Sequence, residues 1–94
     1  MNELLRDFAK LKEQKTTVAV QFIETELGLA LTFCEIAAST DNSEKRQRNV
    51  RNAHKAYQGA KETLEQLAID KQVRATVDSL VARVRDRLAV LGVL

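Results

Sequence analysis

The chain contains no proline and only three glycines in 94 residues, although 30% of its residues are charged. Proline and glycine form most tight turns, and all-β folds need many of them. A chain without them is left with long uninterrupted segments, which at this charge content are helical. The 45% apolar fraction is that of a globular chain rather than a disordered one. The composition therefore predicts an all-α fold in a single domain that spans residues 1–94.

The first expected helix covers residues 2–39 and carries two neighbouring apolar stripes. Their members recur every three or four residues, which is the spacing of a helix face. A helix with so broad an apolar face usually packs between two neighbours. A break at 15–18 would leave residues 1–15 as a short extra N-terminal helix, but one continuous helix is favoured. The first stripe is Leu4, Phe8, Leu11, Val18, Phe22, Leu29, Phe33 and Ile36, and the second is Ala19, Ile23, Ala30, Cys34 and Ala37.

A cluster of small polar residues at 39–43 predicts the loop before a second helix at about 44–67. Asp41 or Ser43 is expected to cap that helix by accepting from its free backbone amides. Glu44 follows Asp41 by three residues, as in a capping box. The apolar residues of the second helix form a narrow seam with two alanines, which lets a neighbouring helix approach closely. The seam is Val50, Ala53, Tyr57, Ala60, Leu64 and Leu67.

The junction at 67–70 contains neither glycine nor proline, so the evidence for a turn there is a change of phase. Continuing the seam of the second helix would place Lys71 in the core. Instead the apolar positions restart at Ile69, which predicts a third helix at about 70–91 with Asp70 as its N-cap. The alternative is a single helix through both segments whose apolar face rotates midway. Three helices joined by short loops favour an antiparallel three-helix bundle with a long first helix.

Residues 1–15 extend beyond the length that the other two helices can cover. If this segment is helical, Leu4, Leu5, Phe8 and Leu11 lie in solvent, and an exposed apolar stripe of this kind normally marks an interface. The C-terminus has a similar surplus of apolar residues. We therefore expect a homo-oligomer, with a dimer as the favoured state.

Charge is unevenly distributed, although the net charge is only +2. Residues 16–44 carry five acids and no cation, whereas residues 45–55, the basic run, carry five cations and no acid. The favoured interpretation of the basic run is a face that is exposed to solvent or paired with acids of the first helix. The second interpretation is a binding site for an acidic protein partner. Nucleic acid is the least favoured partner, because aromatic residues do not interleave with the cations and no recognition helix is evident. The candidate partner-binding residues are Lys45, Arg46, Arg48, Arg51 and Lys55.

The single histidine and the single cysteine lack the neighbours that chemistry needs. No carboxylate lies three or four residues from His54, and Cys34 lies in an apolar stripe of an acidic segment, where a thiol is usually inert. One histidine and one cysteine cannot form a zinc site, and no glycine-rich phosphate loop is present. We predict that the chain is not an enzyme and has no metal or cofactor. Gly28 and Gly59 are expected to allow close helix contacts.

The N-terminal ten residues are charged and lack the apolar core of a signal peptide. The lone cysteine fits a reducing compartment, and no uncharged apolar stretch approaches the roughly 18 residues of a membrane span. These features predict a cytoplasmic protein that does not enter a membrane.

The pattern Ala53-x-x-x-Tyr57-x-x-Ala60 resembles the second helix of a tetratricopeptide unit, and Leu27-Gly28-x-x-Leu31 resembles its first helix. The connection between them is roughly a dozen residues too long for the standard unit, and no second copy of the pattern occurs. The whole chain also resembles small bacterial all-helical proteins of unknown function. That resemblance implies a helical fold and supplies no site.

Overall fold

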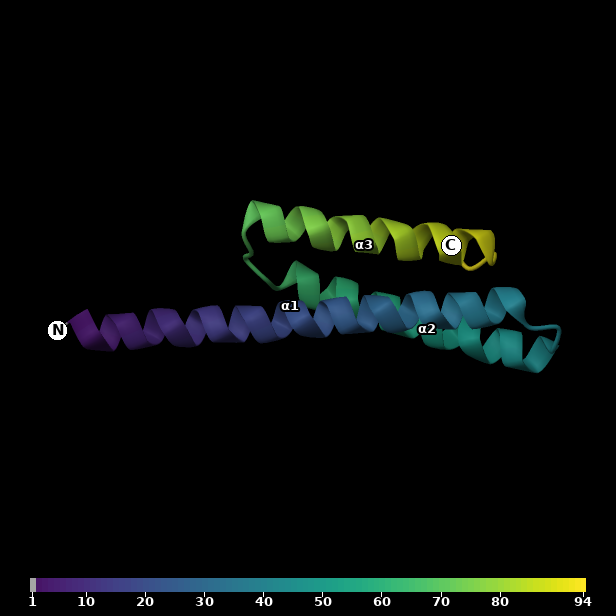
Figure 1. Cartoon of the computed structure of the whole chain (residues 1–94), viewed down its shortest axis with the longest axis horizontal. Coiled ribbons are helices and arrows are strands. Elements are labelled where there is room, and N and C mark those ends of the chain that lie inside the picture. Colours follow the sequence, from purple (N-terminus) through teal and green to yellow (C-terminus); the bar gives the residue numbers. More distant parts are fainter. Residues whose placement is uncertain (1) are drawn as a thin grey trace.

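The computed structural model describes residues 2–94, which form three helices and no strand (Figure 1). Helix α1 spans Asn2–Ser39, α2 spans Ser43–Glu65 and α3 spans Lys71–Val90. α2 runs back along the second half of α1, and α3 reverses direction again (Figure 1). The expected antiparallel three-helix bundle with a long first helix is therefore confirmed.

Helix α1 continues without a break through Thr16 and Thr17, so no separate N-terminal helix forms. The Thr16 hydroxyl donates to the carbonyl oxygen of Lys12, and the Thr17 hydroxyl donates to that of Glu13, both at 2.9 Å. Because both hydroxyls are satisfied within the helix, the two β-branched residues cost only a few tenths of a kcal/mol each. Residues 3–15, which we call the overhang, are all exposed and give the molecule its 63 Å length (Figure 1). The start of the overhang projects beyond α2 and α3, whereas its last residues, from Ala9 on, border the end of α2 and the turn that follows it.

Asn42 caps α2, so the prediction of Asp41 or Ser43 is wrong. The Oδ1 atom of Asn42 accepts from the backbone amide of Lys45 at 2.9 Å. With the cap at Asn42, the third helical position is Lys45 rather than Glu44. The expected capping box therefore does not form.

The turn between α2 and α3 occupies residues 66–70, as the change of phase predicts. Asp70 is the N-cap of α3, because its Oδ1 accepts from the backbone amide of Gln72 at 2.7 Å. One long helix through this region, the alternative reading, does not form. The cap satisfies one of the free amides of the helix start without any glycine or proline in the turn.

Gly28 and Gly59 do not mediate close packing between helices, and Gly92 ends α3. A Cβ added at Gly28 or Gly59 would meet no atom within 4 Å, so the prediction of close contacts there is wrong. Gly92 has φ +82° and ends α3 in a Schellman motif. Its amide donates to the carbonyl of Ala89, and the next amide donates to that of Leu88, both at 3.0 Å. This turn directs the C-terminus back toward the core.

The core lies mainly between α1 and α2, and α3 closes one side of it. The alanines of the predicted α2 seam are fully buried, which allows α1 to approach closely. The one buried polar side chain among the described residues, Asn49, donates from Nδ2 to the carbonyl of Lys45 at 2.8 Å. The side chains with no exposed surface are Ile23, Leu27, Ala30, Ala37, Ala53, Ala60, Val77, Val84 and Leu88.

The second predicted stripe of α1 enters this core, whereas of the first stripe only the end, at Phe33, packs against it. The second stripe is buried from Ile23 to Ala37, whereas the first stays exposed from Leu4 to Leu29. At 100° per residue, the two stripes are separated by about a third of a turn. α2 and α3 together cover the flank of the second stripe. The expectation that both stripes are covered within one chain is therefore wrong.

Candidate functional site

An uncovered row of large apolar side chains runs along α1. Its six members are 44–69% exposed, and successive members are three, four or seven residues apart. These are the a and d positions of a coiled-coil heptad, in which side chains of two helices interdigitate. We call this row the open stripe: Leu4, Phe8, Leu11, Val18, Phe22 and Leu29.

Two polar residues occupy the heptad positions that the open stripe skips. Lys15 takes an a position and Thr25 takes a d position, and both are exposed. A lysine at a single a position lowers the stability of a coiled coil but specifies how its helices pair. The a and d positions along this face of α1 are therefore mostly apolar, and one of them in the first half, Lys15, is charged.

The open stripe includes three residues that the sequence reading assigned to the core, namely Val18, Phe22 and Leu29. The candidate interface residues of the overhang are exposed as predicted, at 52% for Leu11 and more for the others. Leu5 is 68% exposed but lies about 100° around the helix from Leu4, outside the row. The heptad spacing was the signal in the sequence that joins both halves of the row.

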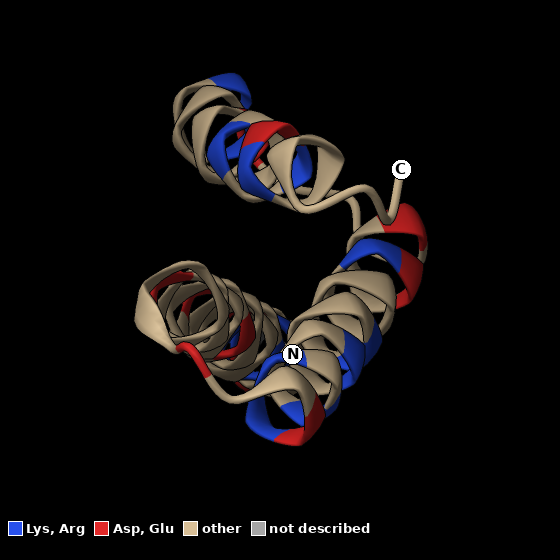
Figure 2. Cartoon of the chain, turned by 90° about the vertical axis from the view of Figure 1, so that its right-hand side faces the viewer, with Lys and Arg blue, Asp and Glu red and all other residues tan. Residues whose placement is uncertain are grey.

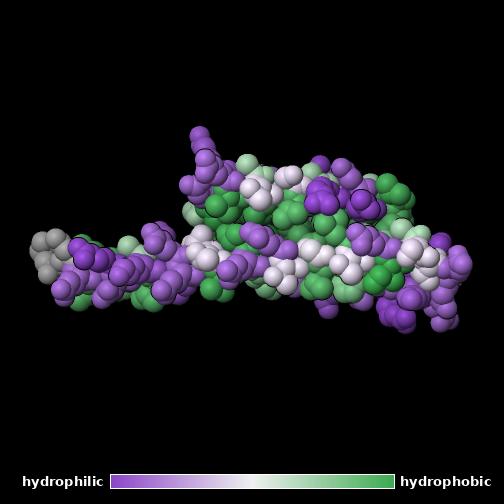
Figure 3. Space-filling model, in the orientation of Figure 1, coloured by the Kyte–Doolittle hydropathy of each residue, from purple (hydrophilic) through white to green (hydrophobic). Residues whose placement is uncertain are grey.

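The open stripe borders a shallow groove between α1 and the end of α2. Leu11, Lys15, Val18 and Phe22 line it from α1, and Thr63 lines it from α2. In Figure 3, apolar side chains appear along the edge of the overhang and continue on the body of the molecule. The groove therefore joins the middle of the row, Leu11, Val18 and Phe22, into one shallow apolar surface.

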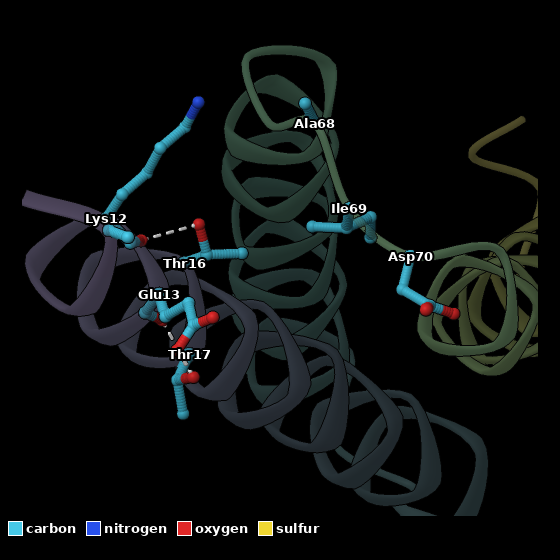
Figure 4. A pocket seen from close by; sticks show the side chains of 8 residues that line it. Lys12, Glu13, Thr16, Thr17, Ala68, Ile69 and Asp70 are labelled. Carbon is cyan, nitrogen blue, oxygen red and sulfur yellow. Dashed lines mark hydrogen bonds between the residues drawn. The ribbon is translucent and has the colours of Figure 1, made fainter. Parts of the chain in front are cut away.

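A second cleft lies where the overhang passes the turn between α2 and α3 (Figure 4). Three of its polar side chains are already engaged, because the hydroxyls of Thr16 and Thr17 donate to their own helix and Asp70 caps α3, which leaves the side chains of Lys12 and Glu13. Small-molecule sites need several convergent polar groups that are free to bind. The described residues of this cleft do not offer such a set. It is lined by Ala9, Lys12, Glu13, Thr16, Thr17, Ala68, Ile69 and Asp70.

The structure separates Arg46 from the rest of the basic run. Its Nε donates to the carbonyl of Ala37 at 3.2 Å, and its Nη2 donates to that of Thr40 at 2.8 Å. These carbonyls lie at the C-terminal end of α1, where the helix dipole favours a cation. Of the two alternatives expected for this face, pairing with acids of the first helix does not occur, because the one ion pair within residues 2–94 is Arg74–Asp78 on α3, at 3.0 Å. The solvated alternative agrees with the exposure of all five cations.

The other cations of the basic run remain exposed. Arg48, Arg51 and Lys55 are three and four residues apart on α2, where cations gather along one side of the helix (Figure 2). We call these three residues the outer basic row. Lys55 also borders a shallow pocket that Glu26 and Leu29 of α1 line from the other side. The nearest aromatic residue along α2, Tyr57, is buried. On α2 the row therefore has no exposed aromatic side chain beside it on which a base could stack.

Neither His54 nor Cys34 lies in a chemical site. The Nε2 of His54 is 3.4 Å from the side-chain nitrogen of Gln58. Cys34 is 2% exposed, and burial raises the pKa of its thiol, an effect that Arg87 opposes and Glu35 reinforces. Among the described residues, no group of three or more His, Cys, Asp or Glu side chains is arranged to hold a metal ion.

Comparison with protein-family models, with curated proteins and with solved structures finds no match for this chain. The resemblances to a tetratricopeptide unit and to small bacterial helical proteins therefore stay predictions. The argument for function accordingly rests on the surface of the molecule.

Helix α1 is long and apolar enough to cross a membrane by length and composition. The sequence predicts no such segment, because no continuous apolar stretch approaches the roughly 18 residues of a membrane span. A core helix of a protein in water passes the same test, and one flank of α1 is such a core. The location of the protein therefore stays a prediction.

Proposed function

We propose that this protein is a non-enzymatic helical interaction module that forms a homodimer through the open stripe of α1. The observation that carries the proposal is the row of six exposed large apolar side chains at heptad spacing. Large exposed apolar patches usually mark interfaces, because covering them removes apolar surface from water. A second copy supplies a matching surface, since a dimer interface with twofold symmetry uses the same patch on both chains.

The size of the open stripe predicts a weak dimer. From Leu4 to Leu29 it extends roughly 38 Å at about 1.5 Å per residue. With a helix about 10 Å wide, the contact face is roughly 400 Å² on each chain. The pair then covers about 800 Å², which is less than the roughly 1,200 Å² of a standard stable interface. We therefore expect a dimer in the micromolar range that dissociates on dilution.

Light scattering tests the proposal on the unmodified protein from about 1 to about 200 µM, since a dimer of this kind follows mass action. The mass is expected to rise from the 10.6 kDa of one chain toward twice that value. A mass that stays at one chain over the whole range would refute self-association.

A lipid bilayer is the competing occupant of the open stripe. Spanning the bilayer would bury Glu24 and Glu26, at a cost of about 2.5–3.5 kcal/mol for each charge near the bilayer centre. The buried and unpaired thiol of Cys34 also fits a reducing compartment such as the cytoplasm. Flotation with neutral lipid vesicles tests this alternative. Co-flotation of a chain that stays monomeric in water would assign the stripe to the bilayer.

The outer basic row supports a second candidate function, the binding of an acidic protein segment. Arg48, Arg51 and Lys55 are exposed, share one side of α2 and have no ion-pair partner within the described residues. Replacing all three with glutamine is expected to abolish binding to a poly-glutamate peptide, measured by fluorescence anisotropy. Salt-sensitive binding to a DNA oligonucleotide at about 50 mM salt, with none to the peptide, would instead assign the row to nucleic acid.

A further inference from the structure

We propose that the two copies pair antiparallel along the open stripe, with the twofold axis between Thr16 and Thr17. The overhang of each copy then lies on the bundle half of α1 in the other. This inference rests on the proposed self-association and adds its orientation and register. Three independent features of α1 support it.

The first feature is the charged position in the open stripe. In a parallel dimer in register, a positions face each other, so Lys15 of one copy would face Lys15 of the other. Two ammonium groups would then be held together in an apolar seam, where charges are costly. In an antiparallel dimer a positions face d positions, and Lys15 lies against Val18. The lysine then covers an apolar neighbour with its stem while its ammonium reaches water.

The second feature is the distribution of charge along α1. Residues 2–15 carry four cations and three acids, a net charge of +1. Residues 16–39 carry three acids and no cation, a net charge of −3. Parallel pairing would align the two acidic halves, whereas antiparallel pairing places each acidic half beside the more basic one. Opposite charges across an interface favour the orientation that brings them together.

The third feature is the match of lengths. The overhang is 13 residues long, and so is segment 18–30, which it faces across the axis. Antiparallel pairing therefore covers the stripe from end to end. It also places most of α2 and α3 of each copy toward opposite ends of the dimer, and only the end of α2, which borders the stripe at Thr63, lies near the axis. The facing positions are Leu4 with Leu29, Phe8 with Thr25, Leu11 with Phe22 and Lys15 with Val18.

Distances between spin labels test the orientation. Labels at Arg6→Cys and, separately, at Glu13→Cys lie on an exposed side of the overhang away from the open stripe. In the proposed dimer, the two labels at position 6 are offset along the axis by 21 residues, roughly 32 Å. The two labels at position 13 are offset by only seven residues, roughly 10 Å. A parallel dimer gives no offset at either position, so both distances would be short and equal.

Electron–electron double resonance on both samples in a Cys34→Ala background is expected to give a distance about 15–20 Å longer at position 6, from the helical rise and the sideways separation of the chains. Two equal distances would overturn the orientation. Sedimentation velocity of the same samples separates this failure from that of the proposed function: a dimer with equal distances refutes only the orientation, whereas a monomer refutes both. If Cys34→Ala unfolds, the natural cysteine can stay, because its buried thiol resists labelling.

Discussion

The substitution Leu11→Gln should weaken the dimer without changing the fold of one chain. Leu11 lies in the overhang, is 52% exposed and faces Phe22 of the second copy in the proposed register. Leucine and glutamine have nearly equal helix propensities, so the helix itself should tolerate the change. The effect is therefore expected in association rather than in the stability of the monomer.

The magnitude follows from the surface that Leu11 still exposes. Burying a whole leucine side chain contributes about 1.5–3 kcal/mol, and half of that remains to be gained here, roughly 1 kcal/mol per chain. The dimer contains two copies, and each glutamine amide adds a desolvation cost of about 0.5 kcal/mol or more. The loss is then about 3 kcal/mol, which corresponds to a dissociation constant roughly 100-fold higher.

Sedimentation equilibrium measures this dissociation constant directly. Leu5→Gln is the matched control, because Leu5 is a neighbouring leucine that is 68% exposed but lies outside the open stripe. It should change the constant by less than about threefold, since its side chain reaches only the rim of the interface. Equal weakening by both substitutions, or none by Leu11→Gln, would refute the assignment of the stripe.

Four further predictions address single residues. Lys15→Leu should tighten the dimer about tenfold in sedimentation equilibrium, because it removes the charge from the seam; weaker association would contradict the heptad register. Asn42→Ala should lower the free energy of unfolding by about 1 kcal/mol in urea titrations, and Asp41→Ala by less than about 0.5 kcal/mol, because only Asn42 caps α2; the reverse order would contradict the cap. Arg46→Ala should lower the free energy of unfolding by about 1 kcal/mol in the same assay, because two hydrogen bonds from a largely exposed side chain to the end of α1 are lost. An unchanged midpoint of the urea transition would contradict those two hydrogen bonds. Burial raises the pKa of the Cys34 thiol above its ordinary value of 9.0, so the thiol ionises at a lower pH in the unfolded chain than in the folded one. The contribution of the neutral thiol to the free energy of unfolding should therefore be fully present below pH 9 and should be lost as pH rises above 9. The Cys34→Ala variant should not show this fall in the free energy of unfolding above pH 9.

The fold was largely predictable because it rests on patterns that a sequence carries openly. The lack of proline and the scarcity of glycine left helices as the remaining option, and the restart of apolar positions at Ile69 located the last turn. The cap of α2 was misplaced by one residue, since Asp41, Asn42 and Ser43 are all good capping residues. Only the backbone path of the loop determines which of them reaches a free amide.

The candidate site was predictable only in its first half. Leu4, Phe8 and Leu11 lie beyond the reach of the other helices, and helix lengths alone reveal that. Phe22 and Leu29 were assigned to the core because both stripes of α1 have helical spacing. Which flank the neighbours cover depends on how α3 crosses the pair α1–α2, a property of packing that one sequence pattern does not encode.

The role of Arg46 had no sequence signature at all. Its partners are backbone carbonyls at the end of α1, and every residue carries a carbonyl. A sequence reading instead looks for side chains of opposite charge, which led to the acids of the first helix. The outer basic row became distinct only when the structure placed Arg46 apart from it.

Amide hydrogen exchange in the overhang, measured by mass spectrometry at about 1 µM and about 200 µM protein, shows whether a second copy covers the open stripe. In a single chain residues 3–15 are all exposed at the free end of α1, and most helical stability in proteins comes from tertiary packing, which this end lacks. The account predicts fast exchange in the overhang at the low concentration and clear protection at the high one, when the second copy covers it. Exchange in the overhang that is the same at both concentrations would contradict it.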